Sequence, residues 1–147
     1  MPASVRSAYS LLELCVTLLL LAVLLGLAAP PVRRALTRAR VRSAREVVAM
    51  ELARTRALAV AHGGAALVLD LPRARAWVES GGTTTPPVVV ADDRLLRVSA
   101  DGAAGDTIRI AFDALGLGHI ASRTLRFRSG DLEARLTVSS YGRVRSG

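Results

Sequence analysis

The feature that most constrains this chain is an apolar run near its N-terminus. Residues 11–32 contain a single charged side chain, Glu13. At about 1.5 Å per residue in a helix, the run is long enough to cross a hydrocarbon layer about 30 Å thick. We therefore expect a membrane-spanning helix. A cleaved secretory signal is the alternative, because Arg6 precedes the run and small residues stand near its end in "LAAP", but the apolar region of such a signal usually has only about 7–15 residues.

Glu13 is the unusual residue of this run. A charged side chain at the centre of a membrane helix costs about 2.5–3.5 kcal/mol on insertion scales, and such groups are usually paired. We therefore expect Glu13 to need a partner.

The segment that follows, residues 33–62, has a strongly helical composition and ends at Gly63-Gly64. Pro30 and Pro31 stand at its junction with the apolar run, and we expect a kink at Pro30 within one long helix from about residue 11 to about residue 61. Apolar side chains at helical spacing predict a face that packs on a domain: Val41, Ala44, Val48, Leu52 and Ala59. Arginines occupy another face, which would meet solvent or anionic lipid headgroups or would form a surface for DNA or a partner protein: Arg34, Arg38, Arg42 and Arg45.

Beyond Gly64 the pattern changes to short runs, most of which alternate apolar and polar residues. This period is typical of half-buried antiparallel strands. Turn-forming segments separate the runs, and Trp77 falls in one of them, where we expect it to be core. The expected strands are residues 66–71, 74–79, 94–99, 107–112, 124–128 and 134–139. The predicted fold class is α+β, a long helix whose second half covers a small antiparallel β-sheet head.

The chemistry-bearing residues argue against an enzyme. All 20 basic residues are arginine, which excludes lysine-dependent motifs, and no nucleophile elbow, metalloprotease helix or phosphate loop is present. The histidines are His62 and His119, and the only cysteine, Cys15, lies in the apolar run. We therefore expect no catalytic residue, no metal, no cofactor and no small-molecule substrate. The net charge of +8 is concentrated in residues 33–62 and 123–147.

The N-terminus reads as a short leader holding Arg6, then "A-Y-S-L-L-E-L" leading into the apolar helix. This pattern resembles the type IV prepilin signal. The resemblance implies a leader of residues 1–8, cleavage by a prepilin peptidase between Ala8 and Tyr9, and N-methylation of Tyr9. It also implies that Glu13 acts in filament assembly by pairing with the methylated N-terminus of a neighbouring subunit. The family usually has glycine at the position of Ala8 and phenylalanine at that of Tyr9.

The rest of the chain resembles the minor pseudopilins that include the type II secretion H subunit and the FimT-like minor pilins. The ending "YGRVR" resembles their G-R-x-R element, carried here by Gly142, Arg143 and Arg145. The resemblance implies a pilin-like organisation: a filament-core helix over 9–32, its continuation over 33–62, and a β-rich periplasmic head over 63–147.

Two functions follow from this resemblance. The first is a minor pseudopilin of a type II secretion system, held in the bacterial inner membrane and assembled with other pseudopilins into a periplasmic filament. The alternative is a minor pilin of a type IV pilus that binds DNA during uptake, with phosphate contacts from Arg143, Arg145, Arg126 and Arg128. Arg143 and Arg145 could instead belong to a solvated last strand, or pack and form ion pairs within the head. A membrane-tethered binding domain unrelated to filaments is a third alternative.

The charges on either side of the apolar run predict the opposite membrane topology, with the head in the cytoplasm. Arg33, Arg34 and Arg38 follow the apolar run, whereas Arg6 alone precedes it, so the positive-inside rule would place the head in the cytoplasm. We give the prepilin signal precedence and expect a single-pass protein with a periplasmic head.

Overall fold

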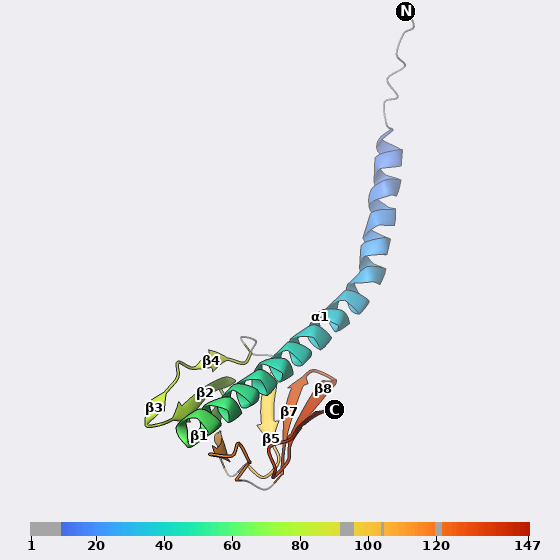
Figure 1. The fold of residues 1–147 in the computed structure, drawn as a ribbon. Coiled ribbons are helices and arrows are strands. Elements are labelled where there is room, and N and C mark those ends of the chain that lie inside the picture. The colour runs from blue at the N-terminus through green and yellow to red at the C-terminus, as the bar shows by residue number, and fades with distance from the viewer. Residues whose placement is uncertain (1–9, 92–95, 104, 120–121) are drawn as a thin grey trace, which may run out of the picture. The chain divides into compact units, whose positions relative to one another are not determined.

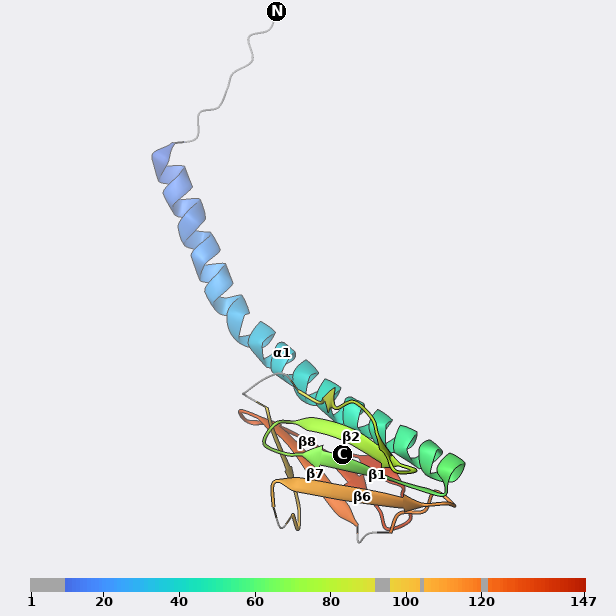
Figure 2. The ribbon, with the colours of Figure 1, turned by 90° about the vertical axis from the view of Figure 1, so that its left-hand side faces the viewer.

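The structure is a computed structural model that describes residues 10–91, 96–103, 105–119 and 122–147. Its contacts divide the chain into two compact units, Met1–Leu36 and Thr37–Gly147. The first unit holds the beginning of the single long helix α1, and the second holds the rest of α1 and all the described strands (Figures 1 and 2).

Helix α1 runs without interruption over Leu11–His62, close to the predicted range. Pro30 and Pro31 both lie within it, although a proline inside a helix removes one backbone hydrogen bond. The kink at Pro30 stays a prediction. Within the described residues, an 18-residue window of α1 has a mean hydropathy of 2.7 and is 0% buried, so by length and composition it could cross a membrane. Gly63, with φ of +80°, follows the last helical residue, as is usual at a helix C-terminus.

The C-terminal part of α1 packs on the head through the predicted face. Val41, Ala44, Val48, Leu52 and Ala59 are all buried, with at most 3% of their surface exposed, and all belong to the hydrophobic core. Figure 2 shows this part of the helix lying along the strands. The prediction that the second half of the helix covers the β-structure is confirmed.

The strands form two antiparallel sheets rather than the single sheet expected. Sheet A has the order β3-β2-β1-β6, with β4 also paired to β2, and sheet B has the order β5-β7-β8-β9. Sheet A consists of β1 (Gly64–Asp70), β2 (Arg75–Ser80), β3 (Thr83–Thr84), β4 (Val88–Val89) and β6 (Thr107–Asp113). Sheet B consists of β5 (Arg97–Ala100), β7 (Arg123–Ser129), β8 (Leu132–Val138) and β9 (Val144–Ser146).

Both sheets turn alternate residues toward one core shared with α1. On β6 the inward residues are Ile108, Ile110 and Phe112, and on β7 they are Leu125 and Phe127. The remaining side chains of these strands face away from the core. The fold is therefore α+β, as predicted, with each sheet offering one outer face.

Trp77 lies on the outer face of sheet A, so the expectation of a core tryptophan is wrong. Its strand neighbours Ala76 and Val78 point into the core, and alternation turns Trp77 outward, where it is half-buried. Its Nε1–H donates to Glu79 Oε1 at 3.4 Å. An aromatic side chain can be half-buried on a sheet surface without joining the core.

Candidate functional site

At the start of α1, Glu13 has a helix-capping position that was not predicted from the sequence. The backbone N–H of Glu13 donates to Ser10 Oγ at 3.2 Å, so Ser10 is the N-cap and Glu13 the third helical residue. Ser10 and Glu13 thus have the spacing of a capping box, and the carboxylate lies at the positive end of the helix dipole. The S-x-x-E pattern itself was the available signal. The predicted cleavage and methylation residues, Ala8 and Tyr9, lie outside the described residues.

The apolar part of α1 has no cover within the described residues. Its large side chains are more than 45% exposed, from Leu11 at 81% to Val16 at 47%. Cys15 is likewise exposed. A surface this apolar is stable in lipid or against other helices rather than in water.

The outer face of sheet B is rich in arginine. Register pairs Arg97 with Arg128 and Arg126 with Arg135, and directly paired residues point to the same side of a sheet. Arg145 pairs with Thr137 and lies on this side as well. We call this set of five the arginine face: Arg97, Arg126, Arg128, Arg135 and Arg145.

Two carboxylates balance part of the arginine face. Arg126 Nη2 lies 3.0 Å from Asp101 Oδ2, and Arg135 Nε lies 2.6 Å from Glu133 Oε1, which is also 3.9 Å from Arg126 Nη1. The hydrogen bond from Arg135 lowers the pKa of the Glu133 carboxyl, and the hydrogen bond to Asp101 raises the pKa of Arg126. Arg97 and Arg145 have no carboxylate within ion-pair distance among the described residues, so the face keeps a positive excess.

Arg143 lies in the turn that leads into β9. Its N–H donates to Ser139 Oγ at 3.1 Å, and its carbonyl accepts the N–H of Ser139 at 2.8 Å, which extends the β8–β9 pairing by one residue pair. Alternation along β9 places Arg143 on the same side as Arg145. Three of the predicted DNA-contacting residues, Arg126, Arg128 and Arg145, therefore share one face, and Arg143 lies at its end.

Arg97 and Arg135 were not predicted as site residues. Both occupy outward positions of their strands, so the alternation of apolar and polar residues could have predicted that they face outward. Their position beside Arg128 and Arg126 depends on the pairing of β5 with β7 and of β7 with β8. Strand partners far apart in sequence cannot be read from alternation alone.

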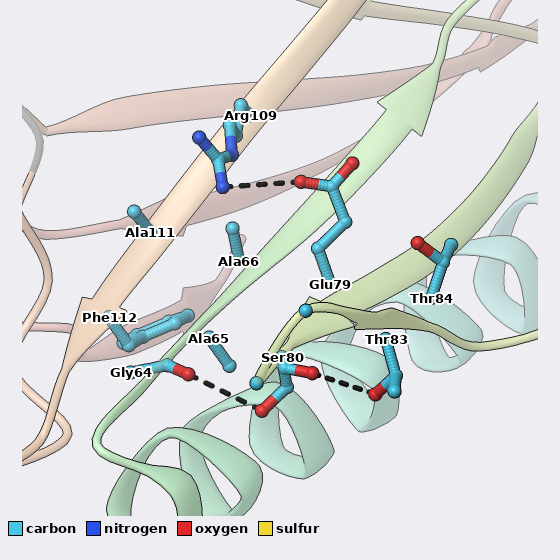
Figure 3. Close-up of a pocket in the computed structure, with 12 residues that line it drawn as sticks. Gly64, Ala65, Ala66, Glu79, Ser80, Thr83, Thr84, Arg109, Ala111 and Phe112 are labelled. Carbon is cyan, nitrogen blue, oxygen red and sulfur yellow. Dashed lines mark hydrogen bonds and ion pairs between the residues drawn. The ribbon is translucent and has the colours of Figure 1, made fainter.

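The outer face of sheet A has a different character (Figure 3). Arg109 and Glu79 point toward each other across Ala66 and form an ion pair of 3.2 Å, beside a hollow of about 440 Å³. Ser80 Oγ donates to the carbonyl of Gly64 at 3.3 Å. These polar groups satisfy each other and leave no excess charge for a ligand. Among the described residues no group of three or more His, Cys, Asp or Glu side chains is placed to hold a metal ion.

A long N-terminal helix whose second half covers antiparallel sheets is a pilin-like α+β fold. Two crystal structures of the type IV minor pilin FimU from Pseudomonas aeruginosa (strain PAO1) share it. One has a TM-score of 0.57 and 16% identity, over 80% of this chain and 92% of that chain. The other has a TM-score of 0.55 and 20% identity, over 72% and 91%. No protein-family model and no curated protein sequence matches the chain.

Proposed function

We propose that this chain is a minor subunit of a pilin-like filament, and specifically a minor pseudopilin of a type II secretion system. The observation that carries the proposal is the difference in burial between the two parts of α1. Its N-terminal part is apolar and exposed, while its C-terminal part is the core element of a folded head. The likeness to a minor pilin supports this reading at the level of fold.

In the proposed assembly, the apolar part of α1 moves from lipid into a bundle of neighbouring helices. The prepilin peptidase cuts between Ala8 and Tyr9, and Tyr9 is N-methylated. The new ammonium group then stands near the N-terminus of a helix, and the Glu13 carboxylate of a neighbouring subunit neutralises it. Before assembly the subunit is held in the inner membrane with its head in the periplasm.

Mass spectrometry of the mature N-terminus tests the processing step. A chain that begins with N-methylated Tyr9 is expected. A chain that still begins at Met1 when isolated from cells with an active prepilin peptidase would contradict the pilin-like function. Ala8→Gly is the matched variant, since it restores the residue that the family usually carries, and it should be processed at least as completely.

DNA binding by a type IV minor pilin is the second candidate function, and the arginine face favours it. Arg126, Arg128 and Arg145 share that face, with Arg143 at its end. Arginine neutralises phosphates without reading sequence, and such binding weakens steeply as salt rises.

The DNA-binding candidate is tested with the full chain in a nonionic detergent, titrated against labelled duplex DNA over a salt series. Changing both Arg143 and Arg145 to Ala should weaken binding and flatten its salt dependence. Arg75→Ala, an exposed arginine on sheet A, is the control. If DNA binding is absent, or is unchanged in the double variant, the secretion function is favoured.

A further inference from the structure

A hollow of about 300 Å³ lies between helix α1 and the edge of sheet B. Arg38, Arg42 and Arg45 line it from the helix, and Glu133 and Gly147 line it from the strand side. The three arginines are spaced i, i+4 and i+7, so they form a row about 10 Å long on one side of α1. The sequence left two interpretations of this row open, a surface facing solvent or lipid headgroups and a surface for DNA or a partner protein.

The charges in this hollow are unevenly balanced. Arg42 Nε is paired with Glu46 at 3.2 Å, whereas Arg38 and Arg45 have no ion-pair partner in the part of the chain that the structure describes. Arg45 is half-buried and has no carboxylate within ion-pair distance among the described residues. The negative charge of Glu133 is already engaged by Arg135 at 2.6 Å and by Arg126 at 3.9 Å. The hollow therefore offers net positive charge to an anion.

The hollow and the arginine face are linked through one carboxylate. Glu133 lines the hollow and also pairs with Arg126 and Arg135 of that face. Gly147 exchanges two backbone hydrogen bonds with Arg135, at 3.1 and 3.2 Å, so the two positive surfaces share one strand edge. Neighbouring strands lie about 4.8 Å apart, which spaces the arginines of the face across four strands. The face points away from the core that α1 covers, so the hollow and the face adjoin at Glu133 rather than forming one surface.

We propose that this hollow extends a nucleic-acid binding surface and holds backbone phosphates through Arg38 and Arg45. The proposal rests on the second candidate function and adds the helix arginines to it. A guanidinium can bind a phosphate through two parallel hydrogen bonds, so arginine suits this ligand. None of the outward residues of sheet B is aromatic. They are Arg97, Ser99, Thr124, Arg126, Arg128, Glu133, Arg135, Thr137 and Arg145. The recognition is therefore of the backbone, independent of sequence.

The test compares the native full chain with Arg38→Ala/Arg45→Ala, in nonionic detergent, by the fluorescence anisotropy of a labelled DNA duplex between about 50 and 200 mM salt. Each lost phosphate contact should lower the slope of log affinity against log salt by about 0.9, so the double variant should lose about 1.8. Arg56→Ala/Arg75→Ala removes two exposed arginines elsewhere and is the control for net charge. Circular dichroism confirms that each variant is folded.

The outcomes separate this inference from the function on which it rests. If Arg143→Ala/Arg145→Ala flattens the salt dependence but Arg38→Ala/Arg45→Ala does not, the hollow is not part of the site, while the DNA-binding function stands. If the native chain binds no DNA, both fail. Vesicles of phosphatidylglycerol form a further arm of the experiment. Loss of vesicle binding in Arg38→Ala/Arg45→Ala without loss of DNA binding would assign the hollow to lipid headgroups and overturn the inference.

Discussion

Two glycines allow close packing where the loop after β6 meets the end of α1 and the turn between β8 and β9. Gly116 and Gly142 have φ of +71° and +74°, in the left-handed region that favours glycine. A Cβ at Gly116 would lie 3.0 Å from Arg56 Nε and 3.2 Å from Val60 Cγ2, and one at Gly142 would lie 3.0 Å from Phe112 Cε1. Asp113 Oδ1 accepts the N–H groups of residues 115 and 117 at 2.9 and 2.8 Å, which holds the loop in this shape.

Gly116→Ala should therefore destabilise the head by more than its backbone conformation alone requires. Gly130 is the control, because its φ is +57° and an added Cβ there would meet nothing within 4 Å. Gly130→Ala should cost about 1–2 kcal/mol for the left-handed conformation. Gly116→Ala should cost at least about 1 kcal/mol more, for the crowding against α1. Chemical denaturation followed by circular dichroism measures both, and equal losses would mean that the Arg56 side chain simply moves aside.

The pKa of Glu133 provides a second prediction at the scale of single residues. The Arg135 hydrogen bond lowers it in the folded head, so the charged carboxylate is favoured by folding. The resulting stability is present above the unfolded pKa of about 4.3 and is lost as pH falls through the lower folded value. In a carboxyl NMR titration, Arg135→Ala should raise the pKa of Glu133. Arg97→Ala, which lacks a contact with Glu133, should change it less, and an unshifted value in Arg135→Ala would refute this assignment.

The C-terminal part of α1 contributes five buried side chains to the core. Leu52 is 1% exposed and Met50, two positions earlier on the same helix, is 63% exposed. Leu52→Ala should destabilise the head by about 2–5 kcal/mol through lost burial and the cavity left behind. Met50→Ala should change the unfolding free energy by no more than about 0.5 kcal/mol, as is usual for surface sites. Similar midpoints for the two variants in urea would show that the helix face is not held as described.

The contrast between α1 and the short strands shows what the sequence could predict. The helix face from Val41 to Ala59 was predicted because a 3.6-residue period persists over several turns. Six of the strands were predicted near their observed positions, since each has enough alternation to recognise. β3 and β4 were missed as strands, and a last strand at β9 was raised only as an alternative for Arg143 and Arg145. Two or three residues define no period, and their pairing depends on partners distant in sequence.

The same reason limited the prediction of the candidate site. Arg126 and Arg128 can be assigned to one side of a strand from local alternation. Their association with Arg97 depends on a connection that leaves β5, passes through β6 in sheet A and returns as β7 beside β5. The division into two sheets was not predicted from the sequence either, because it is decided by how the strands share the core with α1.

At the scale of the whole molecule, one carboxylate has two roles in the proposed function. In the single subunit, Glu13 belongs to the first turn of α1, where Ser10 caps the helix. In the proposed filament, Glu13 neutralises the ammonium group of a neighbour. The first role needs a polar group at the helix start, whereas the second needs its negative charge.

Glu13→Gln separates these roles, since glutamine can also serve in a capping box but carries no charge. The variant should insert in the membrane and fold its head as the native chain does, yet should enter filaments poorly. The measurement is the yield of cross-links between full-length chains in cells that make the filament, together with the fraction of chain in sheared filaments. Ser10→Ala is the control, because it removes the cap, at a cost of about 0.5–2 kcal/mol in helix stability, and keeps the charge. Native incorporation of Glu13→Gln, or an equal loss in Ser10→Ala, would mean that the carboxylate acts only at the start of its own helix, and the assembly role proposed for it would have to be abandoned.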